Sequence, residues 1–198
     1  RASMTVAAMS VGTHTVSMMV SDEVGGTCVD NTTVIVGRAP SVAITAPSDG
    51  STVNQGQTVT FLGLVSDADE PTSSLSVEWF SDRDGALFAG TPDSAGVSVF
   101  TVADLTVGSH TITLTATDSL GLFASTVAVL EVNGLPTAPM VRVTPEPART
   151  TEGLAVAIEA DAVDPEGGAV TYRFEWHPGG ELRAESGTIA SDPTAKGQ

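Results

Sequence analysis

The chain has 198 residues, which is room for one large domain or two small ones, and its 24 acidic and 8 basic residues leave a net charge of −16. Such a surface repels phosphate groups, which argues against nucleic acid and anionic membranes as partners and suits cation binding or a salty extracellular medium. No apolar run approaches the roughly 20 residues of a membrane-spanning helix, and no signal segment opens the chain. We therefore expect no membrane insertion and interpret the chain as a mature or excised fragment.

Residues 1–36 repeat a later part of the chain without a gap. At a displacement of 96 residues they align with residues 97–132, so that VGTHTVSMMVSDEVG corresponds to VGSHTITLTATDSLG. Residues 55–71 align in the same way with residues 152–168, at a displacement of 97. A period of this length is too long for a solenoid and fits one β-sandwich per repeat.

This repeat divides the chain into three parts. We expect the C-terminal half of a first repeat in residues 1–37, a complete repeat in residues 40–133 and the N-terminal part of a third repeat in residues 137–198. Short linkers that contain proline, GRAP and GLPTAP, join them. The partial copies are interpreted either as the result of a cut through a longer array or as halves that complete each other between chains.

The complete repeat contains short segments that are typical of β-strands. Apolar residues alternate with threonines in HTITLTATD, so that His110, Ile112 and Leu114 share one face. We expect strands, in chain order, at residues 41–47, 58–67, 74–82, around 87–90, 97–103, 110–118 and 123–132. About seven strands separated by turns predict an all-β sandwich, with Trp79 and its counterpart Trp176 as core anchors of the third strand.

Two runs of this repeat, VEWFSDRDGALFAG and LTVGSHTITLTATDSLG, resemble the bacterial immunoglobulin-like (Ig-like) and PKD-type repeats of large secreted and cell-surface proteins. Those repeats commonly carry a Trp in the third strand and a DG turn. The resemblance implies tandem Ig-like (PKD-like) β-sandwiches with a non-catalytic spacer, adhesive or carbohydrate-recognising role. Ig-like domains often place a Tyr, whose polar end bonds to the backbone, near the start of the sixth strand, so we expect His14 and His110 to be structural.

Acidic loops are the strongest chemical signal in the sequence. SDADEP and VDPEGG occupy equivalent positions after the second strand of their repeats, at a pole that faces the preceding repeat. Oxygen ligands from several loops are what Ca²⁺ requires, and Asp, Pro and Gly are also ordinary turn residues. No cofactor is required, and Ca²⁺ is the one candidate. Its candidate ligands are Asp67, Asp69, Glu70 and Asp118 at the first junction and Asp164, Glu166, Asn133 and Asp104 at the second.

Two further residues carry chemical patterns. Asn31 begins an Asn-Thr-Thr sequence that matches the N-glycosylation acceptor pattern. Cys28 is the only cysteine, which excludes an internal disulfide, and its counterpart Ala124 predicts a buried or half-buried structural position. The chain contains no GxSxG, HExxH or phosphate-binding loop motif, so we expect that it is not an enzyme.

Three functions fit this architecture. We expect a structural spacer or adhesive array of an extracellular protein, secreted or displayed on a cell surface, whose partners are neighbouring Ig-like repeats and a cell-surface or glycan ligand. The first alternative is a subunit that forms a filament or sheath head to tail, by strand exchange between complementary half-domains of identical chains. The second alternative is a glycan-binding accessory module of a secreted hydrolase.

Overall fold

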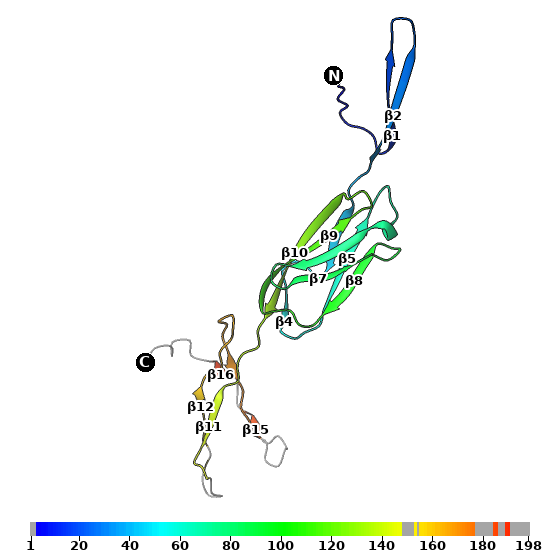
Figure 1. Cartoon of the computed structure of the whole chain (residues 1–198). Coiled ribbons are helices and arrows are strands. Elements are labelled where there is room, and N and C mark those ends of the chain that lie inside the picture. Colours follow the sequence, from blue (N-terminus) through cyan, green and yellow to red (C-terminus); the bar gives the residue numbers. More distant parts are fainter. Residues whose placement is uncertain (1–2, 148–152, 154, 177–183, 186–188, 191–198) are drawn as a thin grey trace.

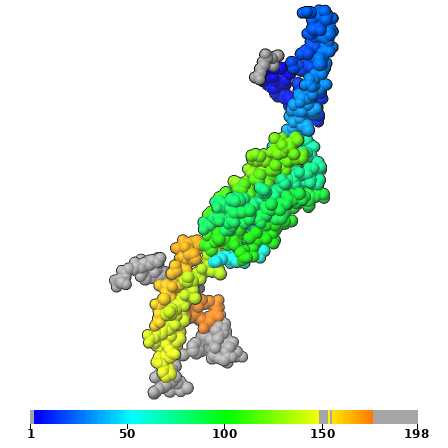
Figure 2. All heavy atoms as spheres, viewed as in Figure 1, coloured from blue at the N-terminus to red at the C-terminus, as the bar shows by residue number. Residues whose placement is uncertain are grey.

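The computed structural model describes residues 3–147, 153, 155–176, 184–185 and 189–190. Figure 1 shows that these residues form three β units in chain order, a hairpin, a sandwich and a group of small sheets. The units follow one another along an elongated molecule (Figure 2). Within the described part, no helix has the length and apolar character needed to cross a membrane.

The first unit is a two-stranded antiparallel hairpin. It consists of β1 (Gly12–Ser21) and β2 (Thr27–Val36), which pair along their whole length. Most of their residues are exposed on both faces. The hairpin lies within the part of the chain expected to be the C-terminal half of a first repeat.

The second unit is a sandwich of two sheets. The five-stranded sheet has the order β4 (Ser51–Asn54), β10 (Phe123–Asn133), β9 (Gly108–Thr117), β6 (Ser76–Ser81) and β7 (Gly85–Gly90). The three-stranded sheet has the order β3 (Ser41–Ala46), β5 (Val59–Ser66) and β8 (Val97–Val102), and a 3₁₀ turn, η1 (Thr72–Ser74), lies between β5 and β6. All pairs are antiparallel except β4 with β10. The predicted all-β Ig-like fold is confirmed, and β4 adds a strand too short to show alternation in the sequence.

The core lies between these two sheets because their strands bury every second residue. The buried core positions are Val59, Phe61 and Val65 in β5, and His110, Ile112 and Leu114 in β9. Trp79 of β6 is only 1% exposed and packs in the same core. The threonines of β9 alternate with these core residues, as the period of two requires.

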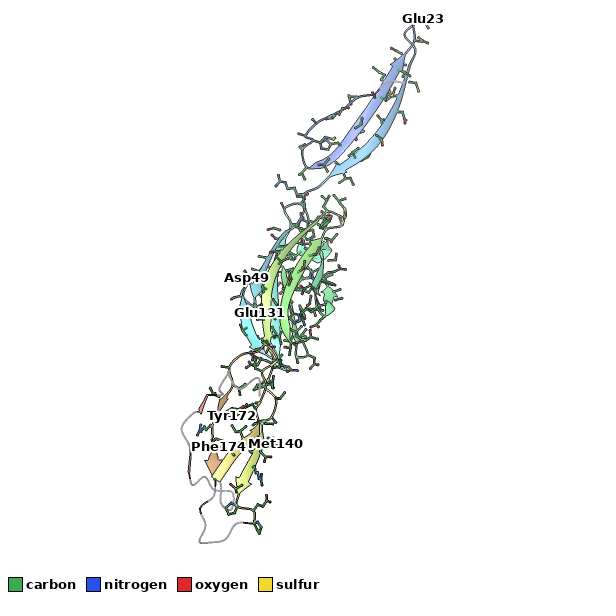
Figure 3. All side chains as sticks on the ribbon, turned by 90° about the vertical axis from the view of Figure 1, so that its left-hand side faces the viewer. Glu23, Asp49, Glu131, Met140, Tyr172 and Phe174 are labelled. Carbon is green, nitrogen blue, oxygen red and sulfur yellow. The ribbon has the colours of Figure 1, made fainter. Side chains whose placement is uncertain are left out.

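The third unit consists of small two-stranded sheets. They pair β11 (Met140–Thr144) with β12 (Ala155–Ala160), β13 (Thr171–Tyr172) with β16 (Ile189–Ala190), and β14 (Glu175–Trp176) with β15 (Ala184–Glu185). Tyr172, labelled in Figure 3, is buried, and its hydroxyl accepts a hydrogen bond from the N–H of Ala162 (2.8 Å) and donates one to Asp161 Oδ1 (3.1 Å). The side chain of Trp176, expected to be a core anchor, lies outside the described residues.

Replacing Trp79 by Ala is expected to reduce the free energy of unfolding of the sandwich by about 3–5 kcal/mol, because it leaves a large cavity in the core. Phe80→Ala is the matched control, since Phe80 is the next residue along β6, faces the other way and is 49% exposed. The control should cost less than about 1 kcal/mol. Urea unfolding of the full chain followed by circular dichroism measures both changes, and equal midpoints for the two variants would contradict the assignment.

Candidate functional site: the joints between repeats

The chain contains five Asp-x-x-Gly sequences, and four of them form turns with the same hydrogen bonds, whereas Asp82 Oδ1 in the fifth accepts the N–H of Thr111 instead. The four turns begin at Asp22, Asp93, Asp118 and Asp164. In each turn the Asp Oδ1 accepts hydrogen bonds from the backbone N–H groups two and four residues later, at 2.7–3.0 Å. The Gly has a φ of 81–85°, which residues with a Cβ rarely adopt, and its N–H donates to the Asp carbonyl. Two candidate calcium ligands, Asp118 and Asp164, thus use one carboxylate oxygen to build a turn.

At the first joint, two neighbouring acidic side chains hold segments that are distant in the sequence. Asp69 Oδ2 accepts a hydrogen bond from the backbone N–H of Arg38 in the linker, at 2.8 Å. The Glu70 carboxylate accepts one bond from the Ser119 hydroxyl and another from the Ser119 N–H, the latter at 3.3 Å to Oε2. The loop after β5 therefore connects the linker to the turn between β9 and β10.

Asp67 shapes this loop from within. Its Oδ1 accepts hydrogen bonds from the N–H groups of Asp69 (2.8 Å) and Glu70 (3.2 Å). Its Oδ2 is buried and has no hydrogen-bond partner in the described part of the chain. Asp67 thus positions the two acidic residues that make the contacts of the joint.

The second joint repeats this design. Glu166, the counterpart of Asp69 at a displacement of 97, accepts a hydrogen bond at Oε1 from the N–H of Gly134 (3.0 Å). Thr137 and Val163 add two bonds, from the Thr137 N–H to the Val163 carbonyl (2.9 Å) and from the Val163 N–H to Thr137 Oγ1 (2.8 Å). In both joints, therefore, a carboxylate from the loop that follows β5 or β12 accepts a hydrogen bond from a backbone N–H of the linker.

Close packing also recurs at the linker glycines. A Cβ at Gly37 would lie 2.6 Å from Leu120 Cδ1, and a Cβ at its counterpart Gly134 would lie 2.7 Å from Pro165 Cγ. Real Cβ atoms essentially never approach other atoms so closely. Each linker thus runs directly against the loops of the repeat that follows it.

The remaining candidate ligands lie at the other pole of the sandwich. The Asn133 side-chain amide donates to Asn54 Oδ1 (3.3 Å) and to the Gly134 carbonyl (3.1 Å), and Asp104 is exposed between β8 and β9. Among the described residues, no group of three or more His, Cys, Asp or Glu side chains is placed to hold a metal ion. The calcium hypothesis stays a prediction, which a thermal melt with calcium and with a chelator tests.

A buried histidine organises the turn between β6 and β7. The His110 side chain is fully buried, and its Nε2 donates to the carbonyl of Thr106 (2.6 Å) while Nδ1 contacts Ser81 Oγ (2.8 Å). His14 makes the same bond, from Nε2 to the carbonyl four residues upstream, at Ser10 (2.6 Å). Both imidazoles thus bond to the backbone, as the resemblance to Ig-like domains implies.

Two acids beside this histidine are held in their ionised form. The Thr111 N–H donates to Asp82 Oδ1 at 2.8 Å and lowers the pKa of Asp82. Burial acts to raise the pKa of Asp84, but hydrogen bonds from the Thr106 hydroxyl and N–H, together with the charge of His110, outweigh it, so the pKa of Asp84 is lowered.

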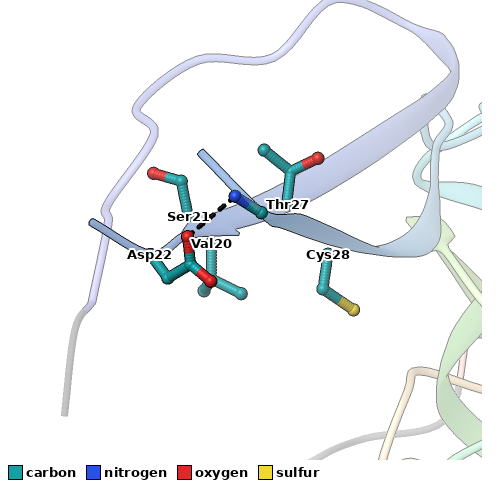
Figure 4. Close-up of a pocket in the computed structure, with 6 residues that line it drawn as sticks. Val20, Ser21, Asp22, Thr27 and Cys28 are labelled. Atoms are coloured by element: carbon teal, nitrogen blue, oxygen red, sulfur yellow. Dashed lines mark hydrogen bonds between the residues drawn. The ribbon is translucent and has the colours of Figure 1, made fainter. Parts of the chain in front are cut away.

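The hairpin carries the two residues with modification or thiol chemistry. Asn31 is exposed on β2. Cys28 is exposed as well, and the expectation of a half-buried position is wrong, because little covers the hairpin face on which it lies. Figure 4 shows an open hollow at the hairpin tip, lined by Val20, Asp22 and Cys28 among others, in which Asp22 is bonded within its turn.

The sandwich, its buried Trp and its bonded His define the central unit as an Ig-like β-domain. Residues 40–114, which lie within this central unit, match the family model of the bacterial Ig domain. The chain is also 29% identical over 141 residues to chitinase A of Pseudoalteromonas piscicida, in a match that covers 71% of this chain and 16% of the chitinase. Fibronectin(III)-like modules of Clostridium thermocellum CbhA are 20% identical, with a TM-score of 0.41 over 73% of each chain.

Acidification is expected to weaken the sandwich through Asp82 and Asp84. Their folded-state pKa values lie below the ordinary value of 3.8, so their stabilisation is present above that pH and is lost as the pH falls through the lower, folded-state values. Urea unfolding at a series of pH values between 7 and 2.5 measures this loss. The double variant with Asp82→Asn and Asp84→Asn should lose less stability on acidification than the wild type, whereas Asp104→Asn should follow the wild type. Parallel curves for the wild type and the double variant would contradict this.

Proposed function

We propose that the chain is a non-catalytic spacer, in which Ig-like repeats are set end to end outside the cell as part of a longer modular protein. The observation that carries this proposal is the joint that is built twice, with Asp69 at the first linker and Glu166 at the second. A spacer must hold its ends apart, and its joints therefore need to restrict bending. The partners in this role are the neighbouring repeats of the same chain.

The chemistry of the linkers supports restricted joints. Each linker contains a proline, which fixes φ and shortens the range of bending, whereas a flexible linker would be rich in Gly and Ser. The hydrogen bonds from the linker N–H groups of Arg38 and Gly134 end on ionised oxygens, and such bonds are stronger than those between neutral groups. A proline and a hydrogen bond to a carboxylate therefore both restrain each linker.

The comparisons support an accessory role in a secreted enzyme. The match covers only 16% of the length of the chitinase, so most of that enzyme lies outside the part that resembles this chain. Bacterial Ig-like domains are usually non-catalytic, and the net charge of −16 suits an extracellular medium. We therefore place the spacer within a secreted, polysaccharide-degrading enzyme, where it would separate a catalytic domain from another module.

Glycan binding is the second candidate, and one feature of the sandwich favours it. Phe80 and Phe123 are 49% and 67% exposed, and the strand register places both on the outer face of the five-stranded sheet, with Thr113 and Thr117 of β9 on that same face. Aromatic rings beside hydroxyl groups suit a sugar ring. Retention of the chain on insoluble chitin, lost when both Phe residues are replaced by Ala, would favour this candidate over a pure spacer.

The spacer proposal is tested by cleavage of the first linker. Asp69→Ala removes the acceptor for the Arg38 N–H, so trypsin is expected to cleave after Arg38 several-fold faster than in the wild type. Asp104→Ala is the matched control, because Asp104 is an exposed acid at the opposite pole. Mass spectrometry of timed digests measures the rate at this bond, and equal rates in the Asp69 and Asp104 variants would show that the carboxylate does not hold the linker.

A further inference from the structure

We propose that Asn133 and Gly134, where β10 ends and the linker to β11 begins (Figure 1), form a site of spontaneous deamidation, and that the hydrogen bond from the Gly134 N–H to Glu166 restrains this reaction while the second joint is closed. In this reaction the backbone nitrogen of Gly134 loses its proton and attacks Cγ of Asn133, and the bond between Cγ and Nδ2 breaks. The leaving nitrogen takes up a proton and departs as ammonia, which leaves a cyclic imide. Water, the only co-reactant, then opens the imide to aspartate or isoaspartate.

The sequence distinguishes this pair from the other asparagines of the chain. Asn31 precedes Thr and Asn54 precedes Gln, whereas Asn133 precedes Gly. Ring closure brings the residue after the asparagine against the forming imide, and a β-branched or long side chain at that residue hinders the approach. Glycine has no Cβ and imposes no such hindrance. Asn133 is therefore the residue at which deamidation should be fastest.

The packing of the joint itself requires the glycine. A Cβ at Gly134 would lie 2.7 Å from Pro165 Cγ and 3.0 Å from Glu166 Oε1, so a larger residue does not fit there. In the first joint the counterpart of this pair, at the displacement of 97, is Val36 followed by Gly37. The first joint thus has the closely packed glycine without an asparagine before it, and the second joint has both.

The nucleophile of the reaction is bonded in the closed joint. Gly134 is buried, and its N–H donates to Glu166 Oε1 at 3.0 Å. The attacking nitrogen must first give up its proton, and a carboxylate that accepts this N–H favours the protonated form, because it would repel the negative charge left on the nitrogen. The reaction therefore requires a local opening of the joint, in which the Gly134 N–H separates from Glu166.

The leaving group is bonded as well. The Asn133 Nδ2 donates to Asn54 Oδ1 at 3.3 Å and to the Gly134 carbonyl at 3.1 Å. The Asn133 carbonyl accepts a hydrogen bond from the N–H of Gln55 at 2.8 Å, beside the pairing of β4 with β10. Both Nδ2 bonds are lost when this nitrogen departs as ammonia. The closed joint thus holds the attacking nitrogen and the leaving nitrogen in hydrogen bonds that the reaction must break.

The products of the reaction weaken the joint. Either product has an oxygen in place of the donating Nδ2, and this oxygen faces the oxygens of Asn54 and Gly134, to which it cannot donate. Isoaspartate also adds one carbon atom to the backbone and displaces Gly134 from its close contact with Pro165. Under the proposed spacer function, on which this last step rests, the second joint loosens as the protein ages and the first joint does not.

Timed incubation of the full chain in mildly alkaline buffer, followed by peptide mass spectrometry, measures the rate at each asparagine through the mass gained when NH₂ is replaced by OH. Glu166→Ala should deamidate at Asn133 several-fold faster than the wild type. Glu166→Gln keeps an acceptor for the Gly134 N–H and should react more slowly than Glu166→Ala. Asp104→Ala removes an exposed acid from the same pole of the sandwich and, as the matched control, should follow the wild type. A rate in Glu166→Ala that is equal to or below that of the wild type overturns the proposal, and so do equal rates in the two Glu166 variants.

The same measurement in concentrated urea tests whether the folded joint causes the difference. There the wild type and Glu166→Ala should react at Asn133 at one common rate that is faster than that of the folded wild type, because the joint is open in both. Different rates in urea would mean that the substitution acts without the joint, and no reaction at Asn133 in urea would mean that the site is absent. Either result overturns the proposal.

Amide hydrogen exchange tests the loosening of the joint. In the isoaspartate fraction of aged protein, exchange at the second linker should be several-fold faster than in fresh protein, whereas exchange at the first linker, the internal control, should be unchanged. Unchanged exchange at both linkers would overturn the loosening. The trypsin test of the spacer function concerns Asp69 at the first linker and does not depend on any of these results.

Discussion

Trp79 joins the two sheets of the central sandwich, and the positions of the loops at both poles depend on this contact. Its ring meets Phe61 and Phe100 of the opposing sheet edge to face, with centroids 5.6 and 5.4 Å apart. Its N–H donates to the buried Ser98 Oγ at 3.0 Å, so the large apolar surface is buried without leaving its polar group unpaired. Because strands β5, β6 and β8 are fixed through these side chains, the loops that follow them are fixed as well.

The alternation of apolar and polar residues along the strands is enough to predict which residues form the core. It does not predict the hydrogen bonds that form the joints. Ile112 and Leu114 could be assigned to the interior because the alternation is visible within β9 itself and one face of this strand had to be buried. The bond between Asp69 and Arg38 joins residues 31 positions apart, and no periodic signal specifies which carboxylate meets which N–H. The exposure of Cys28 had no signal either, since it depends on what packs against the hairpin and not on β2 itself.

The recurring acidic residues have two different physical causes. Asp-x-x-Gly recurs because one Asp oxygen satisfies two N–H groups of a tight turn, and Asp22 shows this at the hairpin tip, at the opposite end of the hairpin from its linker. That pattern was present in the sequence and could have identified Asp118 and Asp164 as turn residues. Asp69 and Glu166 do not begin such a turn, and their recurrence follows from the contact with the linker.

Each joint is formed by a repeat and the linker that precedes it. Arg38 lies just before β3, and the loop that binds it follows β5 of the same sandwich; Gly134 and Glu166 have the same relation to the third unit. A repeat therefore carries its own restraint and needs no matching surface on its neighbour. Duplication of such a unit adds a joint of the same kind each time, so an array can lengthen without a new interface having to evolve.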